Sequence, residues 1–133
     1  MKYKVKIVKV PFGENKGKVL YYPASTNKPE VININRLAKE IEDLSSLSRG
    51  DILNVLSNLE KVAINHLREG HSVKLGDLGS FRTAILGKSA ETAKEVTAAK
   101  VSRIRIAFTP STTMKKEINP TAITLEKLSD SEE

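Results

Sequence analysis

A run of alternating residues carries the most informative chemistry in this sequence. Residues 103–108 read Arg-Ile-Arg-Ile-Ala-Phe, so a strand over this segment presents two guanidinium groups on one face and apolar side chains on the other. Guanidinium groups bind phosphate oxygens through charge and through several N–H donors. The pattern is typical of a nucleic-acid contact, or of a solvated strand whose arginines maintain solubility.

Other segments contain residue types found in enzyme and metal sites, but they lack the pattern that such sites require. Gly87-Lys88-Ser89 copies the end of a phosphate-binding loop, yet Arg82 stands where that loop needs its first glycine. We interpret His66 and His71 as surface residues, and the absence of cysteine excludes thiolate metal sites and a cysteine nucleophile. We therefore expect no enzyme, no metal site, no cofactor and no small-molecule substrate.

The composition indicates a small basic protein with a thin core. The 133 residues carry a formal net charge of +6, with no Trp, three Phe and three Tyr. So few large side chains favour a homodimer, because two pooled cores bury more of each chain. No stretch approaches the roughly 18 apolar residues of a spanning helix, so no membrane contact is expected and a cytoplasmic location is the default.

The charge is distributed unevenly over four stretches of the chain. Residues 1–33 carry a net charge of +5, residues 34–70 of −1, residues 71–118 of +5 and residues 119–133 of −3. We expect an N-terminal extension with a linker in 1–33, the main domain in 34–118, and an acidic flexible tail in 119–133.

The N-terminal part reads as a β-hairpin. Residues 2–7 alternate charged and apolar side chains, 11–17 have loop composition, and 18–22 form a second strand candidate before Pro23. Residues 25–29 resemble a linker, since Ser, Thr, Asn and Pro favour turns.

Two helices are predicted next. Asn33 is an acceptable N-cap for a short amphipathic helix over 34–41. Ser48 followed by Asp51 resembles a capping box at the start of a longer helix, which Gly70 ends as a left-handed residue.

Beyond Gly70, apolar and polar residues alternate with a period of two, as in β-strands. Residues 73–86 predict a β-hairpin around the turn Gly76-Asp77-Leu78-Gly79, and the small polar residues 87–101 bury little and should project. The basic strand 103–108 follows and ends at Pro110. A short helix over 111–118 is then expected, capped by Ser111 or Thr112.

This order of elements resembles the histone-like HU/IHF family of bacterial DNA-bending proteins. Residues 73–82, Val-Lys-Leu-Gly-Asp-Leu-Gly-Ser-Phe-Arg, look like the family's strand followed by Gly-x-Gly-[Ser/Thr]-Phe. Phe108-Thr109-Pro110, followed by Met114-Lys115-Lys116, looks like its C-terminal motif. The resemblance covers roughly residues 34–118, and residues 1–33 resemble the extension of longer HU-like variants.

The resemblance implies an α+β fold and an intertwined homodimer, with a helical base, a β-sheet saddle and projecting β-arms that wrap the DNA minor groove. The implied shared core comprises Leu56, Leu59, Val62, Phe81 and Phe108. The implied DNA-facing positions are Lys74, Arg82, Lys88, Lys94, Lys100, Arg103, Arg105, Lys115 and Lys116. Such residues act through phosphate charge and counterion release, and they carry little sequence information.

The projecting segment departs from the family pattern. Family arms carry an Arg-Asn-Pro tip whose proline wedges between base pairs, whereas residues 83–101 contain neither Pro nor Arg. Ser111 also stands where the family has Gly. We therefore expect a weaker, strongly salt-dependent binder that bends DNA less.

Two functions follow from these observations. The first is architectural, largely non-specific binding of double-stranded DNA in the nucleoid. The alternative is a structural or protein-interaction dimer that kept the HU-like fold, with the N-terminal hairpin as a docking surface. The lysines of residues 2–9 either extend the DNA-binding surface or protect an edge strand, and we favour edge protection.

Overall fold

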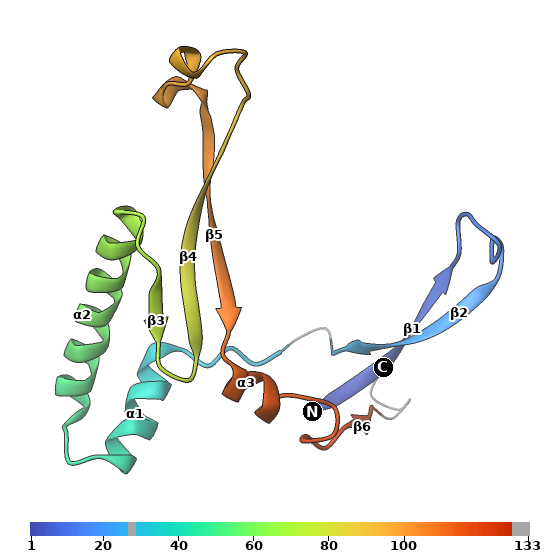
Figure 1. Cartoon of the computed structure of the whole chain (residues 1–133). Helices are drawn as coiled ribbons and strands as arrows, with labels where there is room; N and C mark the ends of the chain where they lie inside the picture. The colour runs from blue at the N-terminus through green and yellow to red at the C-terminus, as the bar shows by residue number, and fades with distance from the viewer. Residues whose placement is uncertain (27–28, 129–133) are drawn as a thin grey trace. The chain divides into compact units, whose positions relative to one another are not determined.

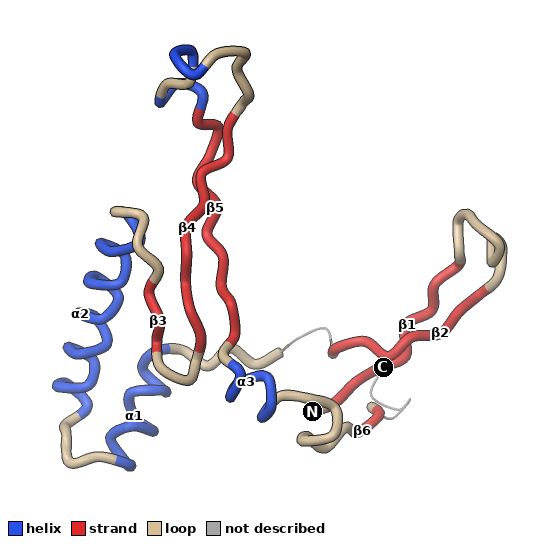
Figure 2. Tube along the Cα trace, viewed as in Figure 1, coloured by secondary structure: helices blue, strands red, loops and turns tan. Residues whose placement is uncertain are grey.

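The computed structural model describes residues 1–26 and 29–128, which form a mixed α+β structure (Figure 1, Figure 2). The chain divides into two compact units. One comprises Met1–Val31 together with the residues from Glu117 onward, and the other comprises Ile32–Lys116. The α+β class expected from the sequence is confirmed.

The first unit contains the predicted N-terminal hairpin. Strand β1 (Lys2–Lys9) pairs antiparallel with β2 (Val19–Ser25). The second strand does not end before Pro23, as the sequence suggested, but continues through it to Ser25. Proline is tolerated there because β2 is an edge of the sheet, whose order is β2-β1-β6, and pairs on one side only.

The C-terminal segment returns to this sheet. Strand β6 (Glu126–Lys127) lies parallel to β1, and the Met1 amino group donates a hydrogen bond to the Thr124 carbonyl oxygen at 2.6 Å. Part of the expected acidic tail is therefore a strand. Residues 129–133 of that tail and linker positions 27 and 28 lie outside the described residues.

Helices α1 (Ile34–Leu44) and α2 (Arg49–Arg68) form the predicted pair. The Asn33 side-chain oxygen accepts the N–H of Arg36 at 3.0 Å, which confirms the first cap. Ser48 Oγ accepts the N–H of Asp51 at 3.2 Å and donates to Asp51 Oδ2 at 2.8 Å. The acidic side chain thus contacts the cap hydroxyl, whereas a capping-box glutamate reaches the cap's N–H.

Helix α2 ends at the left-handed glycine that the sequence predicted. Gly70 has φ +87°, and its N–H donates to the Leu67 carbonyl at 3.1 Å. The His71 N–H donates to the His66 carbonyl at 3.0 Å. These two bonds are the pairing of a Schellman motif, which reverses the chain toward the next strand.

The second sheet has the order β3-β4-β5, built from β3 (Val73–Leu75), β4 (Gly79–Gly87) and β5 (Val101–Pro110). Strands β4 and β5 run on past β3 as a two-stranded arm, whose tip carries two short 3-10 helices, η1 (Ala93–Glu95) and η2 (Ala98–Lys100) (Figure 1). Helix α3 (Thr112–Glu117) follows β5, and Ser111 Oγ caps it by accepting the Met114 N–H at 3.0 Å.

The unit of Ile32–Lys116 buries few side chains within one chain. Among the described residues, Ala38 at 0% and Ile52 at 3% exposure are the buried hydrophobic residues. Both lie on the paired helices α1 and α2. The apolar side chains of the second sheet and of the rest of α2 therefore lack the cover that a core would give them.

Candidate nucleic-acid interface

The strand register of the second sheet separates two chemically different faces. Lys74 lies opposite Ser80, and Arg82 lies opposite Ala107. Side chains alternate along a strand, and directly paired residues share a face. One face, called the basic face below, therefore collects Lys74, Arg82, Arg103 and Arg105.

The opposite face is apolar and receives α2. Phe81 lies opposite Phe108 with 4.9 Å between ring centroids, and Thr83, two residues further along β4, shares their face. The Thr83 hydroxyl donates to the carbonyl oxygen of Leu67 on α2 at 3.3 Å. Because the helix packs on this side, the basic face is turned away from it.

Among the described residues, no acidic side chain forms an ion pair with the basic face. Strands β3, β4 and β5 contain no Asp or Glu. All four basic residues are exposed. Uncompensated cations of this kind create a positive potential that attracts polyanions.

The other predicted basic residues lie elsewhere on the same unit. Lys88 follows β4, and its N–H donates to the Lys100 carbonyl at 2.9 Å, just beyond the paired strands. Lys94 lies in η1 beside Glu95, and Glu91 precedes it. The tip therefore carries mixed charge and is not a continuation of the basic face.

Helix α3 carries the last predicted pair, Lys115 and Lys116. Its start is fixed to the turn between β3 and β4, because the Ser111 N–H donates to the Leu78 carbonyl at 3.1 Å and the Ser111 hydroxyl donates to the Asp77 carbonyl. These bonds attach α3 to the end of the sheet from which the basic face starts.

The predicted dimer-core residues are poorly covered in the single chain. Leu56 and Phe81 are half-buried. Exposure reaches 44% for Leu59, 55% for Val62 and 45% for Phe108. They lie on α2 and on the apolar face of the sheet, and their burial by a second copy stays a prediction.

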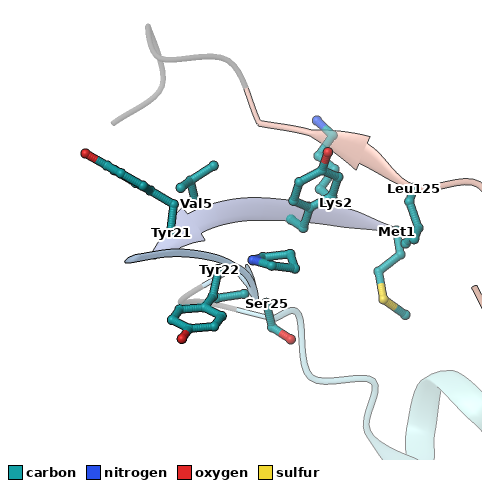
Figure 3. A pocket seen from close by; sticks show the side chains of 10 residues that line it. Met1, Lys2, Val5, Tyr21, Tyr22, Ser25 and Leu125 are labelled. Atoms are coloured by element: carbon teal, nitrogen blue, oxygen red, sulfur yellow. The ribbon is translucent and has the colours of Figure 1, made fainter. Parts of the chain in front are cut away.

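The first unit contains an open cavity of about 650 Å³ beside β1 and β2 (Figure 3). Its lining is apolar and aromatic, with Val5, Tyr21, Tyr22 and Leu125 among its residues and Lys2 as its charged member. Among the residues that the structure describes, no His, Asp or Glu lines it. The cavity is therefore an apolar groove without the paired acid and base of a hydrolytic site.

One cluster of side chains with metal-binding atoms was not predicted from the sequence. Glu69 follows His66 by three residues, and the turn at Gly70 brings His71 back beside both. The spacing of His66 and Glu69 on one helix face could have indicated this group, whereas the approach of His71 depends on the Schellman turn.

Among the described residues, no helix is long and apolar enough to cross a bilayer. A profile of the HU-HIG family, described as "HU domain fused to wHTH, Ig, or Glycine-rich motif", matches residues 1–127.

The chain belongs to the HU-HIG family. The HU resemblance drawn from residues 34–118 is thereby confirmed. The family match also extends further in both directions, because it includes the N-terminal hairpin and β6.

A solved structure shares the fold of this HU-HIG chain. It is a "Putative bacterial DNA binding protein" from Bacteroides vulgatus ATCC 8482, with 15% sequence identity and a TM-score of 0.63. The match covers 96% of this chain and 48% of that one, so the HU-HIG chain spans about half the length of its neighbour. No curated protein matches the chain.

Proposed function

We propose that this HU-HIG chain is an architectural protein of the bacterial nucleoid that binds double-stranded DNA with little sequence preference. The observation that carries the proposal is the basic face. Lys74, Arg82, Arg103 and Arg105 lie on one side of a sheet that holds no acidic residue. Such a surface contacts phosphates, whose charge does not depend on base sequence.

The family supports the DNA partner, since its description names an HU domain. We further propose that the protein acts in the cytoplasm, that it uses no cofactor and that it has no enzymatic activity. Lys88, Lys94, Lys100, Lys115 and Lys116 would contribute further phosphate contacts along the arm and on α3. Because they lie away from the basic face, we expect each of them to add less.

The proposed assembly is the intertwined HU dimer. Its support is the exposure of the apolar sheet face, where Ile85 is 72%, Ile104 62% and Ile106 71% exposed in the single chain. A second copy of the chain would cover this surface together with Leu59 and Val62 of α2. The two basic faces would then contact one duplex.

A salt titration tests the DNA proposal. Fluorescence anisotropy of a labelled duplex of about 30 base pairs should give a steep fall of log K with log salt, by about 0.9 for each phosphate neutralised. Arg103→Glu with Arg105→Glu should abolish binding. The control, Lys39→Glu with Lys61→Glu, makes the same change in net charge on α1 and α2, and it should bind nearly as well as the parent.

The alternative is an HU-fold dimer that serves as a structural or protein-interaction module. The observation that favours it is the arm tip, where residues 83–101 lack Pro and Arg and where Glu91 and Glu95 offset lysines. Absence of duplex binding at low salt, with the dimer intact, would support this alternative and contradict the DNA proposal. In that case the apolar groove of the first unit becomes the surface to test with protein partners.

A further inference from the structure

The end of α2 and the residues after it bring together three side chains with metal-binding atoms. His66, Glu69 and His71 each place one such atom within 4.8 Å of the others. The Nδ1 atoms of the two histidines are 3.3 Å apart, and Glu69 Oε2 is 3.6 Å from His71 Nδ1. The two imidazole rings are tilted by 42°, with centroids 5.5 Å apart.

We propose that His66, Glu69 and His71 form a binding site for a divalent transition metal ion of the zinc class. Zinc bonds to imidazole nitrogen at about 2.0–2.1 Å, so two nitrogens of a tetrahedral site lie about 3.3–3.4 Å apart. The Nδ1 atoms already have this separation. Two imidazoles and a carboxylate also form a ligand set that zinc accepts in proteins.

Hydrogen bonds order the backbone that carries the three ligands. The bonds from Gly70 N–H to Leu67 and from His71 N–H to His66 fix the turn that separates the histidines. The Thr83 hydroxyl bonds to the Leu67 carbonyl and ties the same helix end to β4. Metal binding therefore has to order the three side chains but not the backbone of the turn, which favours affinity.

Charge and access also favour a cation here. The C-terminus of a 20-residue helix carries the negative end of the helix dipole. The side chains of Glu69 and His71 are 66% and 60% exposed, so an ion can reach the site without local unfolding. Three protein ligands leave the fourth tetrahedral position to water.

A contact between the two imidazoles and an ion pair between His71 and Glu69 give the same arrangement without any metal. The two explanations differ in what zinc does to the full-length protein. A site built from three ligands binds one ion per chain with saturation, and it stabilises the folded state against heat. A simple surface contact does neither.

The experiment titrates the full chain, free of DNA, with zinc chloride by calorimetry and repeats the titration with Co²⁺ by absorption spectroscopy. We expect one zinc per chain, a zinc-dependent rise in Tm, and the absorption bands of tetrahedral Co²⁺. Binding should weaken as the pH is lowered, because protons compete with the metal for imidazole. His66→Asn and His71→Asn should each remove the saturable binding, and Glu69→Gln should weaken it.

Glu60→Gln is the matched control, because this exposed carboxylate lies earlier on α2 and outside the cluster, and it should bind zinc like the parent. Zinc binding that survives either histidine substitution would overturn the proposal, as would the absence of saturable binding in the parent. Circular dichroism of each variant without metal confirms that loss of binding is not loss of fold. None of these readouts depends on DNA.

Discussion

At the residue scale, Gly79 determines how closely β4 approaches β5. Its φ is +150°, and a Cβ at this position would overlap the Thr109 carbonyl oxygen and lie 2.8 Å from the Phe108 ring. A side chain there must therefore displace backbone or an aromatic ring. The glycine before Ser80-Phe81, where the family pattern has its second glycine, thus has a packing reason in this chain.

We expect Gly79→Ala to destabilise the protein by about 2 kcal/mol or more, from backbone strain and overpacking together. Denaturant unfolding followed by circular dichroism measures the loss. Gly50→Ala is the control, because Gly50 lies in α2 and a Cβ added there would have its nearest neighbouring atom 4.0 Å away. That change should be neutral or stabilising by up to about 1 kcal/mol. Equal effects at the two glycines would contradict the packing explanation.

The sequence predicted single residues well where the cause is local. Asn33, Ser48 and Gly70 act within one helical turn, so residue type and spacing sufficed to place them. His71 was not connected with His66 and Glu69, because their approach depends on the course of the chain after the helix. Alternation predicted that Arg103 and Arg105 share a face, and the family resemblance implied Lys74 and Arg82 as further DNA-facing positions. The strand register then places all four on one face.

At the scale of elements, the composition of the arm tip leads to a prediction about the proposed DNA bending. Its tip consists of two short 3-10 helices with small polar residues and no proline to wedge between base pairs. We expect a smaller bend than that of a family member with a proline-tipped arm. Fluorescence transfer between the ends of a duplex of about 30 base pairs measures it, with such a member as reference. An equal bend would contradict this expectation.

A second prediction about a single element concerns the lysines of β1. Strand β6 pairs with β1 at Lys2 and Tyr3, and no other described residue pairs with that side of β1. We expect Lys4→Gln with Lys6→Gln to increase aggregation and to leave duplex affinity nearly unchanged. Static light scattering and anisotropy measure the two effects. A loss of affinity without aggregation would instead assign these lysines to the DNA-binding surface.

Long-range pairing explains which elements the sequence could not predict. The parallel partner of β1 is two residues long and lies at the far end of the chain, so no local pattern indicated it. The continuation of β2 through Pro23 likewise depends on the position of β2 at a sheet edge. The helices and the second sheet were predictable because periodicity and turn residues define them locally.

At the scale of the whole molecule, the proposed dimer determines stability. We expect a mass in light scattering of twice the 14.7 kDa of one chain. Leu59→Glu with Val62→Glu should shift the mass toward that of one chain, because charges would enter the shared core. Phe12→Glu is the control, since Phe12 lies in the β1–β2 loop and is 78% exposed. A parent protein that stays monomeric would contradict the intertwined architecture.

The pairing of β6 with β1 also sets an order of events during synthesis. Lys2 must wait for Glu126 before the first sheet is complete, whereas the strands of the second sheet lie close together in the sequence. Local contacts form faster than distant ones, and translation adds only about 5–20 residues per second. The strands β3, β4 and β5 can therefore pair as soon as Pro110 has been made, whereas β1 still lacks its parallel partner at that point. The sheet that contains β1 is thus completed after the strands of the second sheet are available to pair.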